Sequence, residues 1–360
     1  MKKLALFLIL TLLLSAAVSC AGQPAETAKN DTTAAITETV TETDTERTTE
    51  TEPQIKEAPN MQLIPDLKFE TGMRLLTQKD HKAGDSFKTF KKHSFYGTTA
   101  KNAKWRLAQW DSGPDLSECI IESNDDTITD GKWRTFSYNA EENMMTFRLD
   151  TSAYYNGAPA KYGDYWPHLL IEQDDFGVRD MTKKQKAFYS CGSKSIILSM
   201  DIRLGDYSIT PIDGDWVRAA QFLLYFYVKG VSSNDFCWFG VQLFDNRSDM
   251  NDNYIGYDGG KADASGAMIY SIGSRYIYRD KSLWEYAKPK PNGDWVHIEI
   301  DIRPFLDDML EKGLADGYFK VKSLDQLCIN GMNMGWETIG TFDHTMYVKN
   351  FSLTSYPEGR

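Results

Sequence analysis

The sequence predicts an all-β protein, a large antiparallel β-sandwich with one short helix near residues 304–313. Ten runs rich in aromatic and β-branched residues, the composition that strands prefer, occupy much of the chain after residue 103. Clusters of Gly, Asn, Asp and Pro separate them, as in DNRSDMNDN and PNGDW. Because no helical pattern alternates with these runs, they predict antiparallel pairing rather than a parallel α/β sheet.

Two of the runs, QFLLYFYV and FCWFGVQLF, are apolar on both faces, so we expect them to be central strands that are covered on both sides. The run PFLDDMLEKG predicts the helix, because Pro304 suits a helix start and Gly313 a helix end. The expected strands are 104–110, 132–138, 144–149, 167–173, 194–204, 217–228, 235–245, 274–279, 295–303 and 347–356.

The first 60 residues predict export and anchoring. Lys2 and Lys3, an apolar run and small residues precede Cys20, a pattern that resembles the signal and lipobox of bacterial lipoproteins. The resemblance implies removal of residues 1–19, lipidation of Cys20, and attachment to the outer face of the bacterial cell membrane through lipid alone. Residues 20–60 are rich in Thr and Glu and lack aromatic residues, which predicts a disordered tether.

Residues 61–360 are expected to form a single sandwich domain, in which 61–103 is an irregular lead-in. The net charge of −11 comprises +2 from the signal, −6 from residues 21–60 and −7 from this domain. An acidic domain without a basic stripe argues against a nucleic-acid partner. Besides Cys20, the chain has Cys119, Cys191, Cys237 and Cys328. No two of them form a CxxC pair, which argues against a zinc site, and their spacing does not show whether they form disulfides.

The whole domain resembles the concanavalin A-like lectin and glucanase superfamily of jelly rolls. The resemblance rests on the number of strands, the size of the domain, and the runs WVHIEIDIR and FGVQLFDNR. It implies a jelly-roll sandwich that takes a polysaccharide or glycan as its partner.

The run WVHIEIDIRP carries the first candidate site. His297, Glu299, Asp301 and Arg303 alternate with apolar residues and therefore share one face of a strand. Laminarinase-type members of the superfamily carry E-x-D-x-x-E on such a strand, and Glu299 and Asp301 match its first two carboxylates. Pro304 stands where the third carboxylate should be. The charged face is therefore expected to be solvated or to orient a ligand, and a catalytic role in another kind of enzyme is the alternative.

A second candidate lies in WPHLLIEQ, where Trp166, His168 and Glu172 share a face. His168 and Glu172 could act as general base and general acid, or form a buried polar pair that satisfies itself.

Aromatic residues supply the third candidate, because aromatic platforms stack on the apolar faces of sugar rings. Tyr225 and Tyr227 share a strand face with Gln221, Trp238 shares one with Gln242, and Trp336 lies beside Glu337 in a Gly-rich turn. The expected ligand-binding residues are Trp166, Tyr225, Tyr227, Trp238, Gln242, Arg303 and Trp336.

The loop DNRSDMNDN is a candidate site for structural calcium through Asp245, Asp249 and Asn251, because oxygen ligands alternate there. It lacks the glycine and the closing glutamate of an EF-hand loop, and a plain solvated turn is the alternative. No cofactor is expected otherwise.

These patterns favour a lipid-anchored protein that binds carbohydrate. The alternative is a glycoside hydrolase or polysaccharide lyase on the same scaffold, in which His168, Glu172, His297, Glu299 or Asp301 would be catalytic. A third hypothesis is an adhesion or structural module whose partner is a protein.

Overall fold

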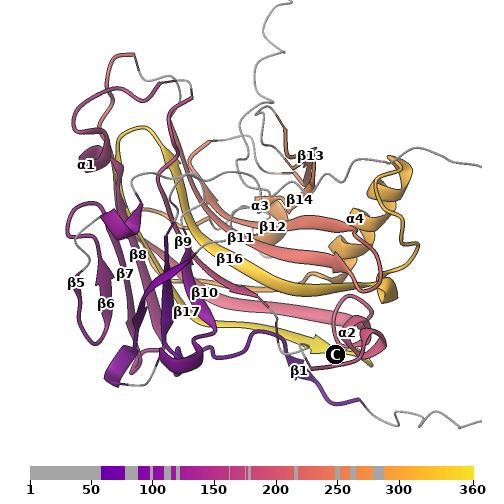
Figure 1. The fold of residues 1–360 in the computed structure, drawn as a ribbon. Helices are drawn as coiled ribbons and strands as arrows, with labels where there is room; N and C mark the ends of the chain where they lie inside the picture. The colour runs from indigo at the N-terminus through magenta and orange to yellow at the C-terminus, as the bar shows by residue number, and fades with distance from the viewer. Residues whose placement is uncertain are drawn as a thin grey trace, which may run out of the picture.

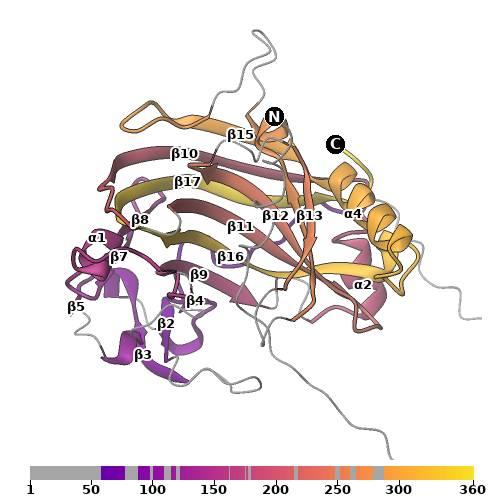
Figure 2. The ribbon, with the colours of Figure 1, turned by 90° about the horizontal axis from the view of Figure 1, so that it is seen from above.

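The computed structural model describes most of the chain after residue 57 (Figures 1 and 2). The described residues are 58–77, 88–97, 100–108, 115–118, 122–161, 163–174, 176, 180–214, 218–247, 252–259, 265–278 and 288–360. The expected signal, Cys20 and nearly all of the expected tether therefore lie outside them. Among the described residues, no helix has the length and apolar character needed to cross a membrane.

Two layered β-sheets make up the fold, which confirms the predicted β-sandwich (Figure 1). The first sheet has eight strands and the order β15-β10-β17-β8-β7-β6-β5, with β1 paired to β17. Its strands are β1 (Met61–Gln62), β5 (Glu122–Ser123), β6 (Thr127–Thr129), β7 (Arg134–Asn139), β8 (Met144–Asp150), β10 (Ser195–Ile209), β15 (Val296–Asp301) and β17 (Phe342–Tyr356).

The second sheet has nine strands and the order β13-β14-β12-β11-β16-β9-β4-β2-β3. Its strands are β2 (Met73–Leu76), β3 (Thr89–His93), β4 (Trp105–Ala108), β9 (His168–Asp174), β11 (Ala219–Gly230), β12 (Phe236–Asp245), β13 (Tyr254–Tyr257), β14 (Met268–Ile272) and β16 (Leu327–Ile339). The two long apolar runs form β11 and β12, which are interior strands as expected. Most pairs are antiparallel, but β12 with β14 and β2 with β4 are parallel.

Four α-helices are described: α1 (Thr151–Tyr155), α2 (Lys183–Phe188), α3 (Ser274–Ile277) and α4 (Arg303–Ala315). The predicted helix is α4, which begins with Pro304 in its first turn and lies at one end of the sandwich (Figure 2). It buries Leu306 and Met309 and contacts strands of both sheets, β10 and β14. Short 3-10 helices occur at Phe95–Gly97, Ala100–Asn102, Leu116–Glu118 and Leu324–Gln326.

The main hydrophobic core fills the space between the sheets. Phe147 of β8 meets Phe222 of β11 edge to face, with ring centroids 5.2 Å apart, and Phe222 meets Trp336 of β16 in the same way at 5.1 Å. Trp336 is fully buried, and its indole N–H donates to the carbonyl oxygen of Phe147 at 3.1 Å. These edge-to-face aromatic contacts stabilise the packing of the two sheets against each other.

The structure differs from three sequence-based expectations. Residues 61–103 contribute β1, β2 and β3 rather than an irregular lead-in. The run 274–279 contains helix α3, although its aromatic residues predicted a strand. The Gly-rich segment around Trp336 lies within the long strand β16, because its glycines allow neighbouring backbones and side chains to approach closely. Cys191, Cys237 and Cys328 are free and buried, and Cys119 lies outside the described residues.

Candidate functional site

The outer face of the nine-stranded sheet, the face turned away from the core, carries the strongest candidate site. Along β11 the residues Phe222, Leu224 and Phe226 belong to the core between the sheets. Side chains alternate along a strand, so Gln221, Leu223, Tyr225 and Tyr227 lie on the opposite, outer face.

One row of polar residues crosses four adjacent strands on this outer face. His168 of β9 pairs with Glu337 of β16, Glu337 pairs with Gln221 of β11, and Gln221 pairs with Asp245 of β12. Directly opposite residues have Cβ atoms about 4.5–5.5 Å apart, so each of these side chains neighbours the next. We call this set the polar row.

Glu337 is a partly buried carboxyl group in the middle of the polar row. Within the described part of the chain, no hydrogen bond or ion pair holds it. Burial raises the pKa of Glu337 to about 7, because removal from water disfavours the charged form. A carboxyl group with this pKa can donate a proton near neutral pH.

Gln221, the cross-strand neighbour of Glu337, is fully buried. Among the residues that the structure describes, neither the Nε2 nor the Oε1 atom of its side chain has a hydrogen-bond partner. An unsatisfied buried polar group costs on the order of 1–3 kcal/mol, and such groups in native proteins call for an explanation. A ligand with both donors and acceptors would satisfy this amide.

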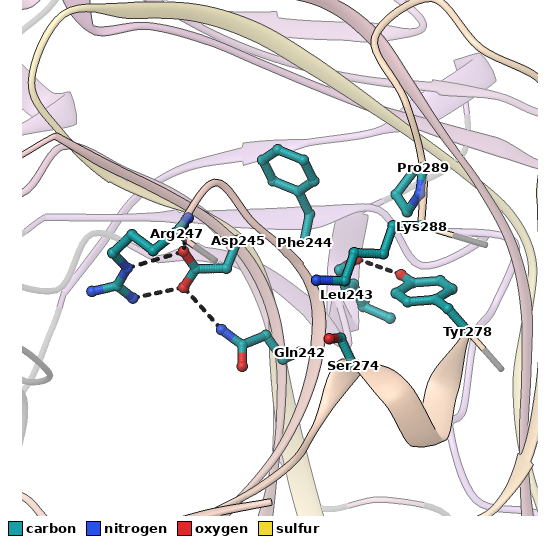
Figure 3. A pocket seen from close by; sticks show the side chains of 9 residues that line it. All are labelled: Gln242, Leu243, Phe244, Asp245, Arg247, Ser274, Tyr278, Lys288 and Pro289. Atoms are coloured by element: carbon teal, nitrogen blue, oxygen red, sulfur yellow. Dashed lines mark hydrogen bonds and ion pairs between the residues drawn. The ribbon is translucent and has the colours of Figure 1, made fainter. Parts of the chain in front are cut away.

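Asp245, at the end of the polar row, is held firmly by two neighbours (Figure 3). Arg247 Nε donates to Asp245 Oδ1 at 2.9 Å and Arg247 Nη2 donates to Oδ2 at 2.6 Å, while Gln242 Nε2 donates to Oδ2 at 2.9 Å. A pocket of about 60 Å³ adjoins this group, between β12 and α3. That volume accommodates a few water molecules but not a sugar ring.

Aromatic side chains gather on the outer face beside the polar row. Leu223 and Tyr225 of β11 form a cluster with Ile269 of β14, against which Trp238 and Tyr254 pack. These residues come from four neighbouring strands, β11, β12, β14 and β13. Gly240 permits the contact, because a Cβ there would lie 2.6 Å from the Tyr225 ring and 2.5 Å from Ser271 Oγ.

The polar row has aromatic residues on its other side as well. Trp166 packs against a cluster that contains Ala219 and Ile339, which lie two residues before Gln221 and two residues after Glu337 on the same face. The row is therefore flanked by Trp166 on one side and by the cluster of Tyr225, Trp238 and Tyr254 on the other.

A second polar group lies further along the same face. Arg106 of β4 donates through Nε to Glu172 Oε2 at 2.5 Å and also pairs with Asp174. Burial alone would lower the pKa of Arg106, but the Glu172 and Asp174 carboxylates outweigh it and raise the pKa above its usual value. Burial, followed by the nearby charge of Glu172, raises the pKa of Tyr227 well above its usual value. Glu172 is thus bound in an ion pair four residues along the sheet from the polar row.

The charged residues of WVHIEIDIRP lie on the other sheet. His297 and Glu299 are exposed on β15, the edge strand of the eight-stranded sheet. His297 Nδ1 lies 2.7 Å from Asp201 Oδ1, and Glu299 accepts from Arg360 at 2.7 Å. The structure therefore does not bring these residues together with His168 and Glu172 in one catalytic group.

Two further candidates at this end of the chain have local structural contacts. Asp301 accepts from the Ile196 backbone N–H at 3.0 Å and from Ser195 Oγ at 2.8 Å. Arg303 opens α4, donates to the Ser193 carbonyl oxygen at 2.8 Å and pairs with Asp307.

Two other sequence-based candidates need correction or fall outside the described residues. Trp336 is a core residue and faces away from the polar row, because it alternates with Glu337 along β16. Asp249 and Asn251 are not described, and Asp245 is occupied by Arg247 and Gln242. In the described ranges no group of three or more His, Cys, Asp or Glu residues could hold a metal ion.

The sequence did not single out Gln221, Glu337, Arg247 or Tyr254 as site residues. Gln221 shares a strand face with Tyr225, and Glu337 directly follows Trp336. Both residues are therefore neighbours of aromatic residues that were predicted to bind the ligand. Their juxtaposition depends on the pairing of β11 with β16, two segments more than 100 residues apart, which local sequence patterns do not reveal.

Comparison with known proteins gives similarity at the level of structure. No family model matches the chain, and no curated protein sequence matches it significantly. A family 12 xyloglucanase from Bacillus licheniformis aligns with 10% identity over 71% of this chain and 94% of its own, with a TM-score of 0.38. The endoglucanase cel12A from Rhodothermus marinus aligns with 12% identity over 61% and 84%, with a TM-score of 0.33.

A third solved structure is the xyloglucanase domain of NopAA, a type three effector from Sinorhizobium fredii, in complex with cellobiose. It aligns with 12% identity over 66% of this chain and 90% of its own, with a TM-score of 0.33. Similarity at these identities and TM-scores says nothing about the ligand or the reaction of this chain.

Proposed function

We propose that this protein binds a polysaccharide on the outer face of its nine-stranded sheet. The observation that carries the proposal is the fully buried amide of Gln221, which lies beside the carboxyl group of Glu337, with neither group hydrogen-bonded within the described part of the chain. Sugars offer hydroxyl groups that both donate and accept, which is what this pair of side chains lacks.

The aromatic residues around the polar row support the same ligand class. Trp166 lies on one side of the row, and Tyr225, Trp238 and Tyr254 lie on the other. The buried indole N–H of Trp238 also lacks a partner among the residues described, so this ring combines an apolar surface with an unsatisfied hydrogen-bond donor. Aromatic surfaces next to unsatisfied polar groups suit the apolar faces and hydroxyl edges of sugar rings.

The charges on this face favour a neutral glycan. Arg247 is paired with Asp245, and Arg106 is paired with Glu172 and Asp174. Since these cations are compensated by carboxylates, they provide little net attraction for an anionic polymer.

The proposal is tested by electrophoresis of residues 61–360 in native gels that contain soluble neutral polysaccharides. We expect at least one polymer to retard the wild type and Trp238→Ala to migrate without retardation. Trp295→Ala is the matched control, because Trp295 lies at the other sheet beneath Arg203 and Lys349. Equal retardation of wild type and Trp238→Ala would contradict this site, and no retardation by any polymer would favour a protein partner.

Hydrolysis of a glycan is the second candidate function, and the raised pKa of Glu337 favours it. A carboxyl group whose raised pKa keeps it partly protonated near pH 7 suits the general acid of a glycosidase. Release of new reducing ends from a polymer, lost in Glu337→Gln, would establish this function.

Anchoring through Cys20 completes the proposal and rests on the sequence pattern before that residue. In a bacterial host, metabolic labelling with a fatty acid should label the full chain, and Cys20→Ala should abolish the label. Labelling that survives the substitution would contradict lipidation at this residue.

A further inference from the structure

Gln221 and Glu337 are opposite residues on one face of two paired strands, a placement that suits the two catalytic carboxyl groups of a retaining glycosidase. Such enzymes hold the two groups about 5–5.5 Å apart, one as nucleophile and one as acid. Directly opposite residues on paired strands have Cβ atoms about 4.5–5.5 Å apart. Gln221 and Glu337 are opposite residues on one face, and their side chains have the same length.

We infer that this site binds a sugar ring across Gln221 and Glu337 without cleaving the chain, because an amide stands where a nucleophilic carboxylate would be required. The inference rests on the proposed function and deepens it. It assigns Gln221 and Glu337 as the central contacts, and it takes a pyranose ring with adjacent free hydroxyl groups as the ligand.

The chemistry of the amide explains both parts of the inference. Its Nε2 donates and its Oε1 accepts, so two adjacent sugar hydroxyls would satisfy both atoms, which have no partner in the described ranges of the chain. An amide carries no negative charge, so it neither attacks the anomeric carbon effectively nor stabilises positive charge that develops there.

The other groups of the polar row do not replace the missing carboxylate. Asp245 lies two strands from Glu337, and Arg247 and Gln242 occupy its oxygen atoms. His168, on the other side of Glu337, is a neutral or positive group rather than a carboxylate. Glu172 is bound to Arg106 and pairs with Asn333, four residues from Glu337 along β16.

Gln221→Glu would restore a complete pair. Two adjacent buried carboxyl groups cannot both ionise easily, so one would carry the charge and the other would keep its proton. The carboxylate at position 221 would form a bond to the anomeric carbon while the glycosidic C–O bond breaks and Glu337 gives its proton to the departing oxygen. Water would then attack the anomeric carbon, Glu337 would take its proton, and the bond to position 221 would break.

The experiment compares wild type, Gln221→Glu and the double variant Gln221→Glu/Glu337→Gln on a polymer that retards the wild type in gels. We expect Gln221→Glu to release reducing ends on the order of a hundredfold faster than the wild type or the double variant. Proton NMR of the first products should show retained anomeric configuration. Intact mass spectrometry with a 2-deoxy-2-fluoro glycoside should show one covalent adduct at position 221.

Each outcome bears on a separate claim. Hydrolysis by the wild type at the rate of Gln221→Glu would overturn the inference, and so would a folded Gln221→Glu that binds the polymer but cleaves nothing and forms no adduct. Gln221→Asn tests the binding role alone, and it should weaken retardation at least about tenfold while melting like the wild type. If no polymer retards any variant, the proposed function fails and the inference fails with it.

Discussion

Gln221 and Glu337 are cross-strand neighbours on the outer face of the nine-stranded sheet, and neither side chain has a hydrogen-bond partner among the described residues. One is a fully buried amide and the other a partly buried carboxyl group whose pKa is raised to about 7. Two polar groups left unsatisfied side by side lower the stability of the fold, and a ligand that completes their hydrogen bonds offsets that cost.

Glu337→Gln should change how stability depends on pH. Burial raises the pKa of Glu337 to about 7, above its ordinary value of 4.5, so the folded protein binds more protons than the unfolded chain between these values. The wild type should therefore lose about 1–3 kcal/mol of unfolding free energy as pH rises from 5 to 8. In Glu337→Gln the unfolding free energy should fall less over the same pH range, because the titration of Glu337 no longer contributes to the loss. Chemical unfolding at the two pH values measures it, and parallel losses in both proteins would contradict the raised pKa.

Arg106→Met should destabilise the protein strongly. The substitution removes a cation from two carboxylates, one of which, on Glu172, is fully buried. Removal of one partner from a buried ion pair costs about 3–5 kcal/mol, because the remaining charge stays in a poor environment. Urea unfolding measures the loss. The further substitution Glu172→Gln should recover part of it, and no recovery would show that packing of the Arg106 side chain, rather than its charge, accounts for the effect.

His297→Ala should leave stability and glycan binding nearly unchanged. The His297 side chain is exposed, and its contact with Asp201 lies at the surface of the eight-stranded sheet, away from the polar row. Exposed ion pairs contribute about 0–1 kcal/mol. Thermal melting and gel retardation should both match the wild type. Loss of retardation in His297→Ala would place ligand binding on the eight-stranded sheet and contradict the proposed site.

Local patterns were sufficient to predict the architecture. Alternation and β-branched content marked most strands, the doubly apolar runs marked β11 and β12 as interior, and Pro304 with Gly313 marked α4. Strand β2, by contrast, is only four residues long, and a short strand carries too few alternations to be recognised. The run SRYIYR shows the opposite case, because its composition suits a strand although the backbone turns into α3.

The candidate site was harder to predict, because it depends on which strands pair. The sequence placed Gln221 and Tyr225 on one face, which the structure shows, but it did not reveal that Glu337 lies opposite Gln221. His168 and His297 were both candidates for catalysis in the enzyme alternative, although the pairing of β9 with β16 and of β15 with β10 puts them in different sheets. Register between distant segments, rather than residue type, determines which groups share a site.

Trp336 and Trp238 should separate a core role from a binding role. Trp336 is fully buried between the sheets, where it meets Phe222 and donates to the Phe147 carbonyl oxygen, so Trp336→Ala should cost about 3–5 kcal/mol of unfolding free energy. Trp238 is partly exposed on the outer face, so Trp238→Ala should cost less and should abolish retardation by the glycan. Urea unfolding measures the stability of both variants, and gel retardation measures their binding of the glycan. A Trp336→Ala variant that is as stable as the wild type but fails to bind the glycan would contradict the core role. It would support the original prediction that Trp336 contacts the ligand.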